Sequence, residues 1–84
     1  MAKAVVRIGD YCTGIPVHFC MSGSRDVFVN GYPVCRKGDV LTLGETLTQG
    51  SSAVFVNGIG IARVGDTVSC GFKVINGSSS VFSG

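Results

Sequence analysis

The hydrophobic residues of the chain occur in short runs separated by glycine and small polar residues. At 27–31 the sequence is VFVNG, and the same five residues return at 54–58. Side chains that alternate with a period of two, as Phe28 does with its flanking valines, are typical of a strand. Each run ends in Asn-Gly, which favours a tight hairpin because both turn residues must adopt positive φ. No segment keeps the 3.6-residue period of a helix for long, so the pattern predicts an all-β fold of short strands and hairpins.

These runs belong to a repeat with two elements. The first element is a Val-Phe pair that recurs at a constant spacing of 27 residues, beginning at Val27, Val54 and Val81. The second element is Arg-x-Gly-Asp, which begins at Arg7, Arg36 and Arg63. Two copies of the repeat are continuous, with the Val-Phe pair first and Arg-x-Gly-Asp after it. The chain is therefore predicted to contain three similar units.

The third unit is divided between the two ends of the chain. Residues 2–10, AKAVVRIGD, correspond to 57–66, NGIGIARVGD, in the middle copy, while VFSG stands at 81–84. We therefore expect the chain to close as a pseudo-threefold ring, with Val5 and Phe82 on neighbouring strands. An open solenoid would need separate caps at its two ends, which argues against that alternative. A ring of three units within one monomer presents a face of approximate threefold symmetry, which fits a trimeric partner.

Length and composition indicate one small domain, residues 1–84, with a modest core. Charged residues make up 14% of the chain, against roughly 25% in an average globular domain. The net charge is +2 and the basic residues are scattered, which argues against a nucleic-acid or anionic-lipid surface. The N-terminal residues lack the apolar run of a signal peptide, and no stretch approaches the roughly 20 apolar residues of a membrane helix, so we expect synthesis in a cytoplasm.

The residues that could carry chemistry stand where the repeats differ from one another. They are Cys12, His18, Cys20, Cys35 and Cys70. All lie near Gly-Asp turns, which a threefold arrangement would bring together at one end, where one histidine and three or four cysteines make a tetrahedral site for Zn²⁺ or iron. A domain this small usually needs a metal ion or a disulfide to stabilise it. Because a reducing cytoplasm disfavours disulfides, this favours a metal ion. The alternative is that some of the cysteines are buried free thiols, which pack as small hydrophobes.

Three segments of the chain resemble the PAAR-repeat proteins. They are GSRDVFVNGYPVCRKGD at 23–39, GSSAVFVNGIGIARVGDTVSCG at 50–71 and the closing GSSSVFSG. The resemblance implies a small, conical or pyramid-like β domain that caps the trimeric β-helical spike of a contractile injection machine. Such machines include type VI secretion systems and the tail baseplates of bacteriophages. It also implies a metal ion near the apex, held by His and Cys side chains, with Zn²⁺ expected and iron as the alternative.

The resemblance also implies which residues hold the metal. Cys70, in GDTVSCG, falls on the metal-binding cysteine of the family, and Cys35, in PVCRKGD, stands where relatives often carry His. His18 and Cys20 resemble a His-x-Cys element of some relatives, and Cys12 is a substitute ligand. The second loop, LTLGETLTQ at 41–49, has neither His nor Cys, so the site implied here is richer in thiolate than is usual.

The expected function is that of a non-enzymatic, metal-stabilised spike tip. The chain stops within the third repeat, so we expect a bare cap without an extension or an effector domain, which favours a phage or phage-like baseplate over an effector carrier. We expect a monomer that binds one copy per spike trimer, assembles into a virion tail or an injection-machine tip, and helps the spike pierce the outer membrane of a target cell.

Two other functions compete with this expectation. A small enzyme would have to use a cysteine with His18, because Asp10, Asp39 and Asp66 recur in every repeat and fit a turn role better than catalysis. A zinc-stapled nucleic-acid module would need a basic face, which the scattered charges do not supply.

Overall fold

The computed structural model describes residues 3–13 and 17–83. Its regular elements are very short strands and one turn of 3₁₀ helix. In chain order they are β1 (Lys3–Ala4), β2 (Phe28–Val29), β3 (Tyr32–Pro33), η1 (Thr42–Gly44), β4 (Phe55–Val56), β5 (Ile59–Gly60) and β6 (Phe82–Ser83). Within the described ranges there is no α-helix, and no helix has the length and apolar character needed to cross a membrane. The predicted all-β fold is confirmed.

The strands form three separate antiparallel pairs that share one register. β2 pairs with β3, β4 with β5, and β1 with β6. In each pair the phenylalanine of the repeat lies opposite the residue three positions before the arginine of Arg-x-Gly-Asp. The opposed residues are Phe28 and Pro33, Phe55 and Gly60, and Phe82 and Ala4. The three units are thus equivalent in backbone pairing as well as in sequence.

The two continuous hairpins turn at Asn-Gly, as the sequence predicts. Asn30 and Asn57 have φ of 54° and 55°, and the glycines that follow have φ of 82° and 77°. Both central residues therefore adopt the left-handed conformation of a type I′ turn, whose twist matches that of the flanking strands.

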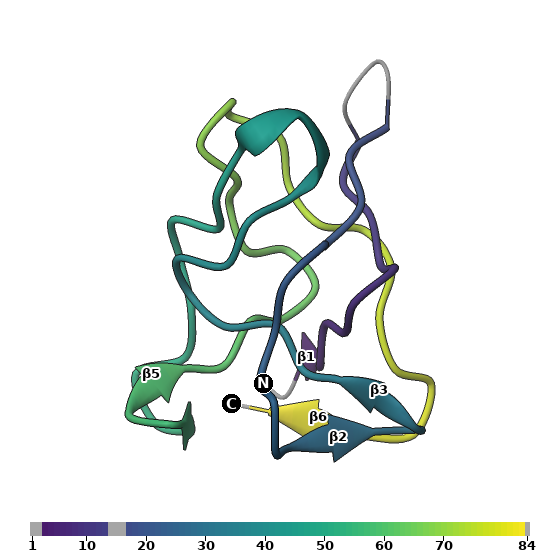
Figure 1. Ribbon diagram of the computed structural model, residues 1–84, viewed down its shortest axis with the longest axis vertical. Coiled ribbons are helices and arrows are strands. Elements are labelled where there is room, and N and C mark those ends of the chain that lie inside the picture. Colours follow the sequence, from purple (N-terminus) through teal and green to yellow (C-terminus); the bar gives the residue numbers. More distant parts are fainter. Residues whose placement is uncertain (1–2, 14–16, 84) are drawn as a thin grey trace.

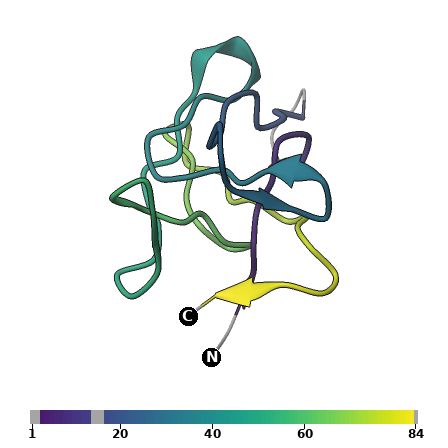
Figure 2. The same ribbon diagram turned by 60° about the horizontal axis from the view of Figure 1, so that its bottom comes forward.

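The remaining pair joins the two ends of the chain. Ala4 lies opposite Phe82, and the N–H of Val5 donates a hydrogen bond to the carbonyl of Val81 at 3.0 Å. Figure 2 shows β6 and the N-terminal segment meeting at the same end of the molecule. The predicted closure of the ring by the termini, with Val5 beside the strand of Phe82, is confirmed.

A closed triangle of backbone hydrogen bonds links the three units. The N–H of Val6 donates to Ala62 (3.0 Å), that of Ala62 to Cys35 (2.9 Å), and that of Cys35 to Val6 (2.9 Å). All three residues have an exposed fraction of 0%. Because each unit donates to one neighbour and accepts from the other, the pseudo-threefold axis passes between the three segments that contain these residues.

The main hydrophobic core repeats around this axis. Its nine buried residues fall into three sets of equivalent positions, namely Val6, Cys35 and Ala62; Cys12, Leu41 and Val68; and Cys20, Leu47 and Val74. The last two sets are joined by isolated bridges that again run around the ring, Cys20–Leu41, Leu47–Val68 and Cys12–Val74. Three of the four cysteines therefore occupy positions that hold Val, Leu or Ala in the other units.

The Arg-x-Gly-Asp element is a structural turn in all three units. Each aspartate accepts hydrogen bonds from the backbone N–H and from the guanidinium of the arginine three residues earlier. The ion pairs are Arg7–Asp10 at 3.1 Å, Arg36–Asp39 at 3.0 Å and Arg63–Asp66 at 2.9 Å. The carboxylates are thus used in the fold, as their recurrence predicts.

The Gly-Ser pairs form a second repeated turn. The hydroxyls of Ser24, Ser51 and Ser78 each accept hydrogen bonds from the N–H groups two and three positions later. The preceding glycine is required by close approach of the backbone. A Cβ at Gly23, for example, would lie 2.5 Å from the carbonyl oxygen of Val34.

These elements give the molecule two different ends. The hairpins lie at one end, and the loops that follow the three Arg-x-Gly-Asp turns extend to the other, where η1 is located (Figure 1). The described residues measure 28 × 27 × 22 Å along their principal axes. We call these two regions the hairpin end and the tip.

Candidate functional site

The three loops at the tip share one backbone hydrogen bond. The N–H two residues after the aspartate of Arg-x-Gly-Asp donates to a carbonyl on the returning side of the loop. The bonds are Cys12 to His18 (3.0 Å), Leu41 to Glu45 (2.7 Å) and Val68 to Phe72 (2.8 Å). His18, Glu45 and Phe72 are therefore equivalent positions around the pseudo-threefold axis.

A cluster of potential metal ligands surrounds the imidazole of His18. Its Nδ1 atom lies 3.5 Å from Sγ of Cys12, 3.8 Å from Sγ of Cys70 and 3.7 Å from Oε1 of Glu45. His18 and Cys12 are buried, whereas Cys70 is exposed. We call Cys12, His18, Glu45 and Cys70 the tip cluster.

The structure thus brings together two of the four predicted ligands, His18 and Cys70, with the predicted substitute Cys12. Glu45 is an addition that the sequence analysis missed, because only His and Cys were considered in the second loop. One signal was available: Glu45 is the only glutamate of the chain and the only acidic residue of its loop.

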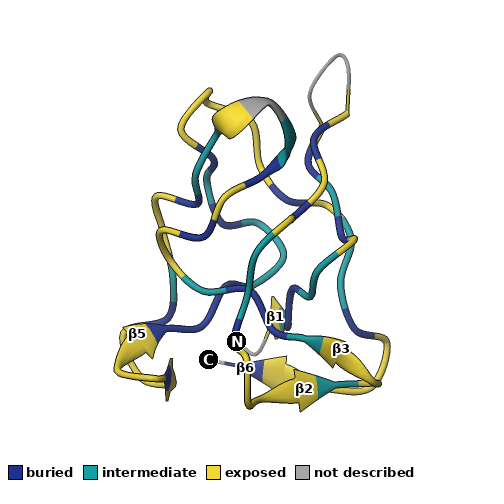
Figure 3. Cartoon of the chain, in the orientation of Figure 1, coloured by how far each residue is buried: buried dark blue, intermediate teal, exposed yellow. Residues whose placement is uncertain are grey.

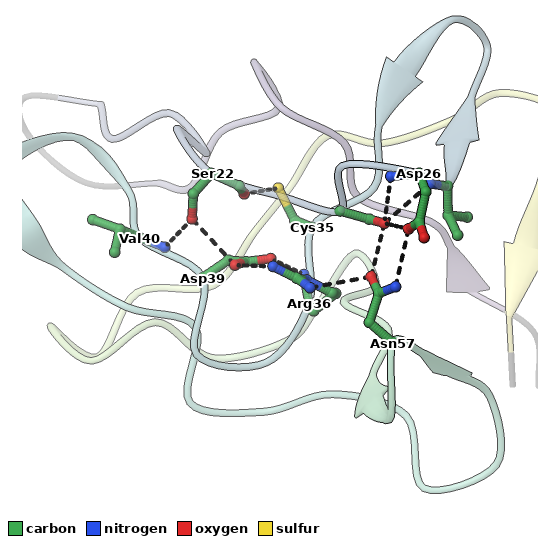
Figure 4. Close-up of polar contacts among 9 residues, drawn as sticks. Ser22, Asp26, Cys35, Arg36, Asp39, Val40 and Asn57 are labelled. Carbon is green, nitrogen blue, oxygen red and sulfur yellow. Dashed lines mark hydrogen bonds and ion pairs between the residues drawn. The ribbon is translucent and has the colours of Figure 1, made fainter.

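Cys20 and Cys35 lie outside the tip cluster, in the main hydrophobic core, to which Cys12 also belongs. The Cys35 thiol donates a hydrogen bond to the carbonyl of Ser22 at 3.3 Å (Figure 4). A hydrogen bond with the Cys20 thiol, followed by burial, raises the pKa of Cys35 well above its usual range. A thiol that stays protonated packs as a small hydrophobe, which is the alternative reading of these cysteines. Their predicted role as metal ligands stays a prediction.

The donor set of the tip cluster fits Zn²⁺ chemically. Zn²⁺ takes thiolate ligands at about 2.3 Å and imidazole at about 2.0–2.1 Å, so neighbouring sulfur and nitrogen ligands of a tetrahedral site lie about 3.5 Å apart. The distances from His18 Nδ1 to the two sulfur atoms are close to that value. Among the described residues, however, no group of three or more Cys, His, Asp or Glu side chains is placed so that it could hold a metal ion as it stands. The tip cluster is a set of donor atoms around Nδ1 of His18 and not a preformed tetrahedral site.

The hairpin end carries a different kind of feature, a repeated set of exposed hydrophobic side chains. Phe28, Phe55 and Phe82 are 55%, 58% and 56% exposed, which is almost the same value in the three units. The valine before each of them is exposed as well, and Figure 3 shows exposed segments along the hairpins. We call the six residues of the three Val-Phe pairs the hairpin face.

Polar contacts between neighbouring units hold the hairpins in place. The Oδ1 atom of Asn57 lies 2.8 Å from the Ser24 hydroxyl and accepts a hydrogen bond from Arg36 at 3.2 Å. The side-chain amide of Asn57 donates to Asp26 at 2.9 Å (Figure 4). Asp26 also accepts a hydrogen bond from the Ser24 hydroxyl at 2.8 Å. The hydrogen bond from Asn57 is the main cause, and that from Ser24 the second, of a lowered pKa of Asp26.

Asn30 repeats the arrangement at the next boundary. It accepts from Ser78 at 2.6 Å and from Arg7 at 3.1 Å, and donates to Ser80 at 3.0 Å. Each Asn-Gly turn is thereby fixed against the Gly-Ser turn of another unit.

Comparison with known proteins agrees with this geometry. The sequence model of the PAAR motif family matches residues 37–84, which is more than half of the chain. The matched region includes Glu45 and Cys70 of the tip cluster and two of the three Val-Phe pairs. A search of curated proteins found no match. The repeated hairpins, the Arg-x-Gly-Asp turns and the family match lead to one conclusion: the chain belongs to the PAAR motif family.

Proposed function

We propose that this protein is the non-enzymatic tip of a trimeric spike, with its hairpin end against the spike and its loop end pointing outward. Membership of the PAAR family gives the chain a structural role at the spike tip of a contractile injection machine. Beyond this role, we propose that one chain binds each spike trimer, that the tip holds a metal ion, and that the protein helps the spike pierce the outer membrane of a target cell. Phage tail baseplates and type VI secretion systems are both machines of this kind.

The observation that carries the docking proposal is the hairpin face. Its three phenylalanines are spaced by 27 residues, lie at the same register position and are exposed to the same extent. Three equivalent patches on one monomer can each contact one of three identical chains in the same way. A single tip can therefore bind a trimer although the tip itself is a monomer. Repeated exposed aromatic and aliphatic side chains also mark a surface that a partner covers.

The two-stranded hairpins add a second reason. Each of the three sheets consists of two strands only. One edge of each is already used, because the carbonyls of Pro33, Gly60 and Ala4 accept hydrogen bonds from neighbouring units. The strands that carry the phenylalanines are therefore the ones whose edges a strand of the partner could pair with. A β-helical spike ends in strands of its own. The contacts would therefore be apolar and main-chain in character, and we expect binding to depend little on salt.

The tip cluster supports metal binding at the other end. Cys12, His18 and Cys70 supply soft sulfur and nitrogen donors, for which Zn²⁺ is the expected ion and iron the alternative. A bound ion would tie the first and third loops together at a point where the chain has little regular structure. Small domains with a thin core gain much of their stability from such an ion, and a stiff tip suits a protein that is pushed through a membrane.

The docking proposal is tested by mixing the chain with the trimeric spike protein encoded beside it and measuring the mass of the complex by light scattering. We expect one chain per trimer, with similar binding at low and high salt. A variant with Ser in place of Phe28, Phe55 and Phe82 should remain folded and lose binding. Three chains per trimer, or no complex at any salt concentration, would contradict the proposal.

A further inference from the structure

We propose that Glu45 is a ligand of the metal ion at the tip, so that all three units of the ring contribute donors to one site. The inference rests on the proposed metal binding by the tip cluster, and it adds an oxygen ligand that the sequence motifs do not assign. It also explains how a second loop without His or Cys can take part in the site.

Glu45 occupies the same position in its unit of the repeat as His18 does in the first unit. Its carbonyl accepts the hydrogen bond of Leu41, as the carbonyl of His18 accepts that of Cys12. Cys12 and Leu41 each follow the aspartate of their turn by two residues, so the two bonds are equivalent. Glu45 is therefore the counterpart of the histidine at the centre of the cluster. The first loop is two residues longer than the others, which hides this match when positions are counted from the aspartate.

One oxygen of the Glu45 carboxylate reaches the tip cluster. Oε1 of Glu45 is buried and has no hydrogen-bond partner among the described residues. It lies 3.7 Å from Nδ1 of His18, which is too far for a hydrogen bond. A buried carboxylate oxygen without a partner is rare in native structures, and an ion at the site is one of the recognised explanations.

The donors of the tip cluster are distributed over all three loops. Cys12 and His18 come from the first loop, Glu45 from the second and Cys70 from the third. Three identical loops would offer three identical ligands, whereas a tetrahedral ion needs a fourth. The longer first loop supplies two donors and the other loops one each, which makes four. Sulfur, nitrogen and carboxylate oxygen are all ordinary ligands of Zn²⁺.

The competing interpretation is an ion pair between Glu45 and a protonated His18. In that case Glu45→Gln would lower the melting temperature of the metal-free protein and leave its metal affinity unchanged. If Glu45 is a ligand, the opposite holds. The metal-free variant should melt at the same temperature as the metal-free parent or slightly higher, because it removes the charge of a side chain that is 21% exposed and whose Oε1 has no hydrogen-bond partner among the described residues. Its metal affinity should fall.

The test is a titration of the metal-free, reduced full chain with Co²⁺, followed by visible absorption, and a competition with Zn²⁺. We expect the parent to bind one Co²⁺ per chain with the intense bands of a four-coordinate thiolate site. Glu45→Gln should bind at least about tenfold more weakly, a lower bound taken from the effect of removing groups that only support a ligand. Glu45→His should restore tight binding with a shifted spectrum, and Asp26→Asn, a carboxylate change at the hairpin end, should have no effect.

Each outcome decides a separate point. Equal affinity and an identical spectrum for the parent and for Glu45→Gln would overturn the assignment of Glu45 and leave metal binding by Cys12, His18 and Cys70 intact. If the parent takes up neither Co²⁺ nor Zn²⁺, the metal site itself is overturned, and Glu45 with it. If Glu45→Gln does not fold, the spectrum of Glu45→His decides, because a nitrogen donor in place of oxygen changes the bands only when residue 45 is bound to the ion.

Discussion

The hairpin end and the tip are built from the same repeat, but only the hairpin end keeps the same residues at equivalent positions. At the hairpin end the three units keep Val-Phe at equivalent positions with almost equal exposure. At the tip, equivalent positions hold His18, Glu45 and Phe72. Symmetry is kept where a trimeric partner would be contacted and is given up where a single ion would be bound. One ring of three can thus serve a threefold partner on one side and an asymmetric site on the other.

The largest expected effect comes from opening the ring. Deleting residues 79–84 removes β6 and the hydrogen bond from Val5 to Val81. Because every unit is bonded to both others, we expect the loss of a large part of the roughly 5–15 kcal/mol that stabilises a typical domain. Thermal unfolding followed by circular dichroism measures it, with the exposed Ser79→Ala as a control. A truncated protein that melts like the parent would show that the ring is not cooperative.

The next effect separates the two kinds of cysteine. Cys35→Ala should cost about 1–2 kcal/mol with or without metal, because it leaves a small cavity on the axis and removes the donor to Ser22. Cys70→Ser changes an exposed residue and should shift the metal-free stability by less than about 0.5 kcal/mol. Its full effect should appear only when Zn²⁺ is present.

Chemical denaturation with and without a chelator measures both differences. If Cys35→Ala abolishes the stabilisation by Zn²⁺ while Cys70→Ser keeps it, the assignment of the tip cluster is wrong and the ligands lie in the core.

A smaller effect is expected at the hairpin face. Phe55→Ser replaces a side chain that is 58% exposed, so the stability of the free domain should change by less than about 0.5 kcal/mol. Binding to the trimeric spike should weaken by about 1–3 kcal/mol, as for an aromatic anchor in an interface. Phe28→Ser and Phe82→Ser should each give a similar loss, because the three positions are equivalent. Isothermal titration calorimetry compares them; one dominant phenylalanine among the three would contradict threefold docking.

The smallest effect concerns Asp26. Hydrogen bonds from Asn57 and Ser24 lower its pKa in the folded protein. Its contribution to stability is therefore fully present above the pKa of an unfolded aspartate, about 3.9, and is lost as the pH falls through the lower folded value. Asp26→Asn should lower the melting temperature slightly near neutral pH, where this contribution is present, and the difference from the parent should vanish as the pH falls through the folded pKa. Melting temperatures of the parent and the variant between neutral and acidic pH test it; parallel curves would contradict it.

Most of the fold could be predicted because local signals and the repeat agree. Asn-Gly after Val-Phe-Val requires positive φ at both turn residues and so fixes two hairpins, and the split repeat fixes the third. The recurrence of Asp10, Asp39 and Asp66 correctly indicated turns, since each carboxylate is bonded to its own arginine.

The tip cluster could be predicted only in part. Nearness to a Gly-Asp turn does not tell whether a side chain points into the core or into a loop. The repeat itself held the answer for Cys20, which is 27 residues from Leu47 and so shares a core position with it. Cys35 likewise corresponds to Ala62. Glu45 could not be found by a search for His and Cys, and its contact with His18 depends on the return path of two loops.

The most direct test of the account is native mass spectrometry of the complex between this chain and the trimeric spike. We expect a single species containing three spike chains, one copy of this chain and one Zn²⁺. For Cys70→Ser we expect loss of the metal mass without loss of the complex. A complex with three copies of this chain, or failure of the metal-free Cys70→Ser variant to dock, would contradict the separation of a symmetric hairpin end from an asymmetric tip.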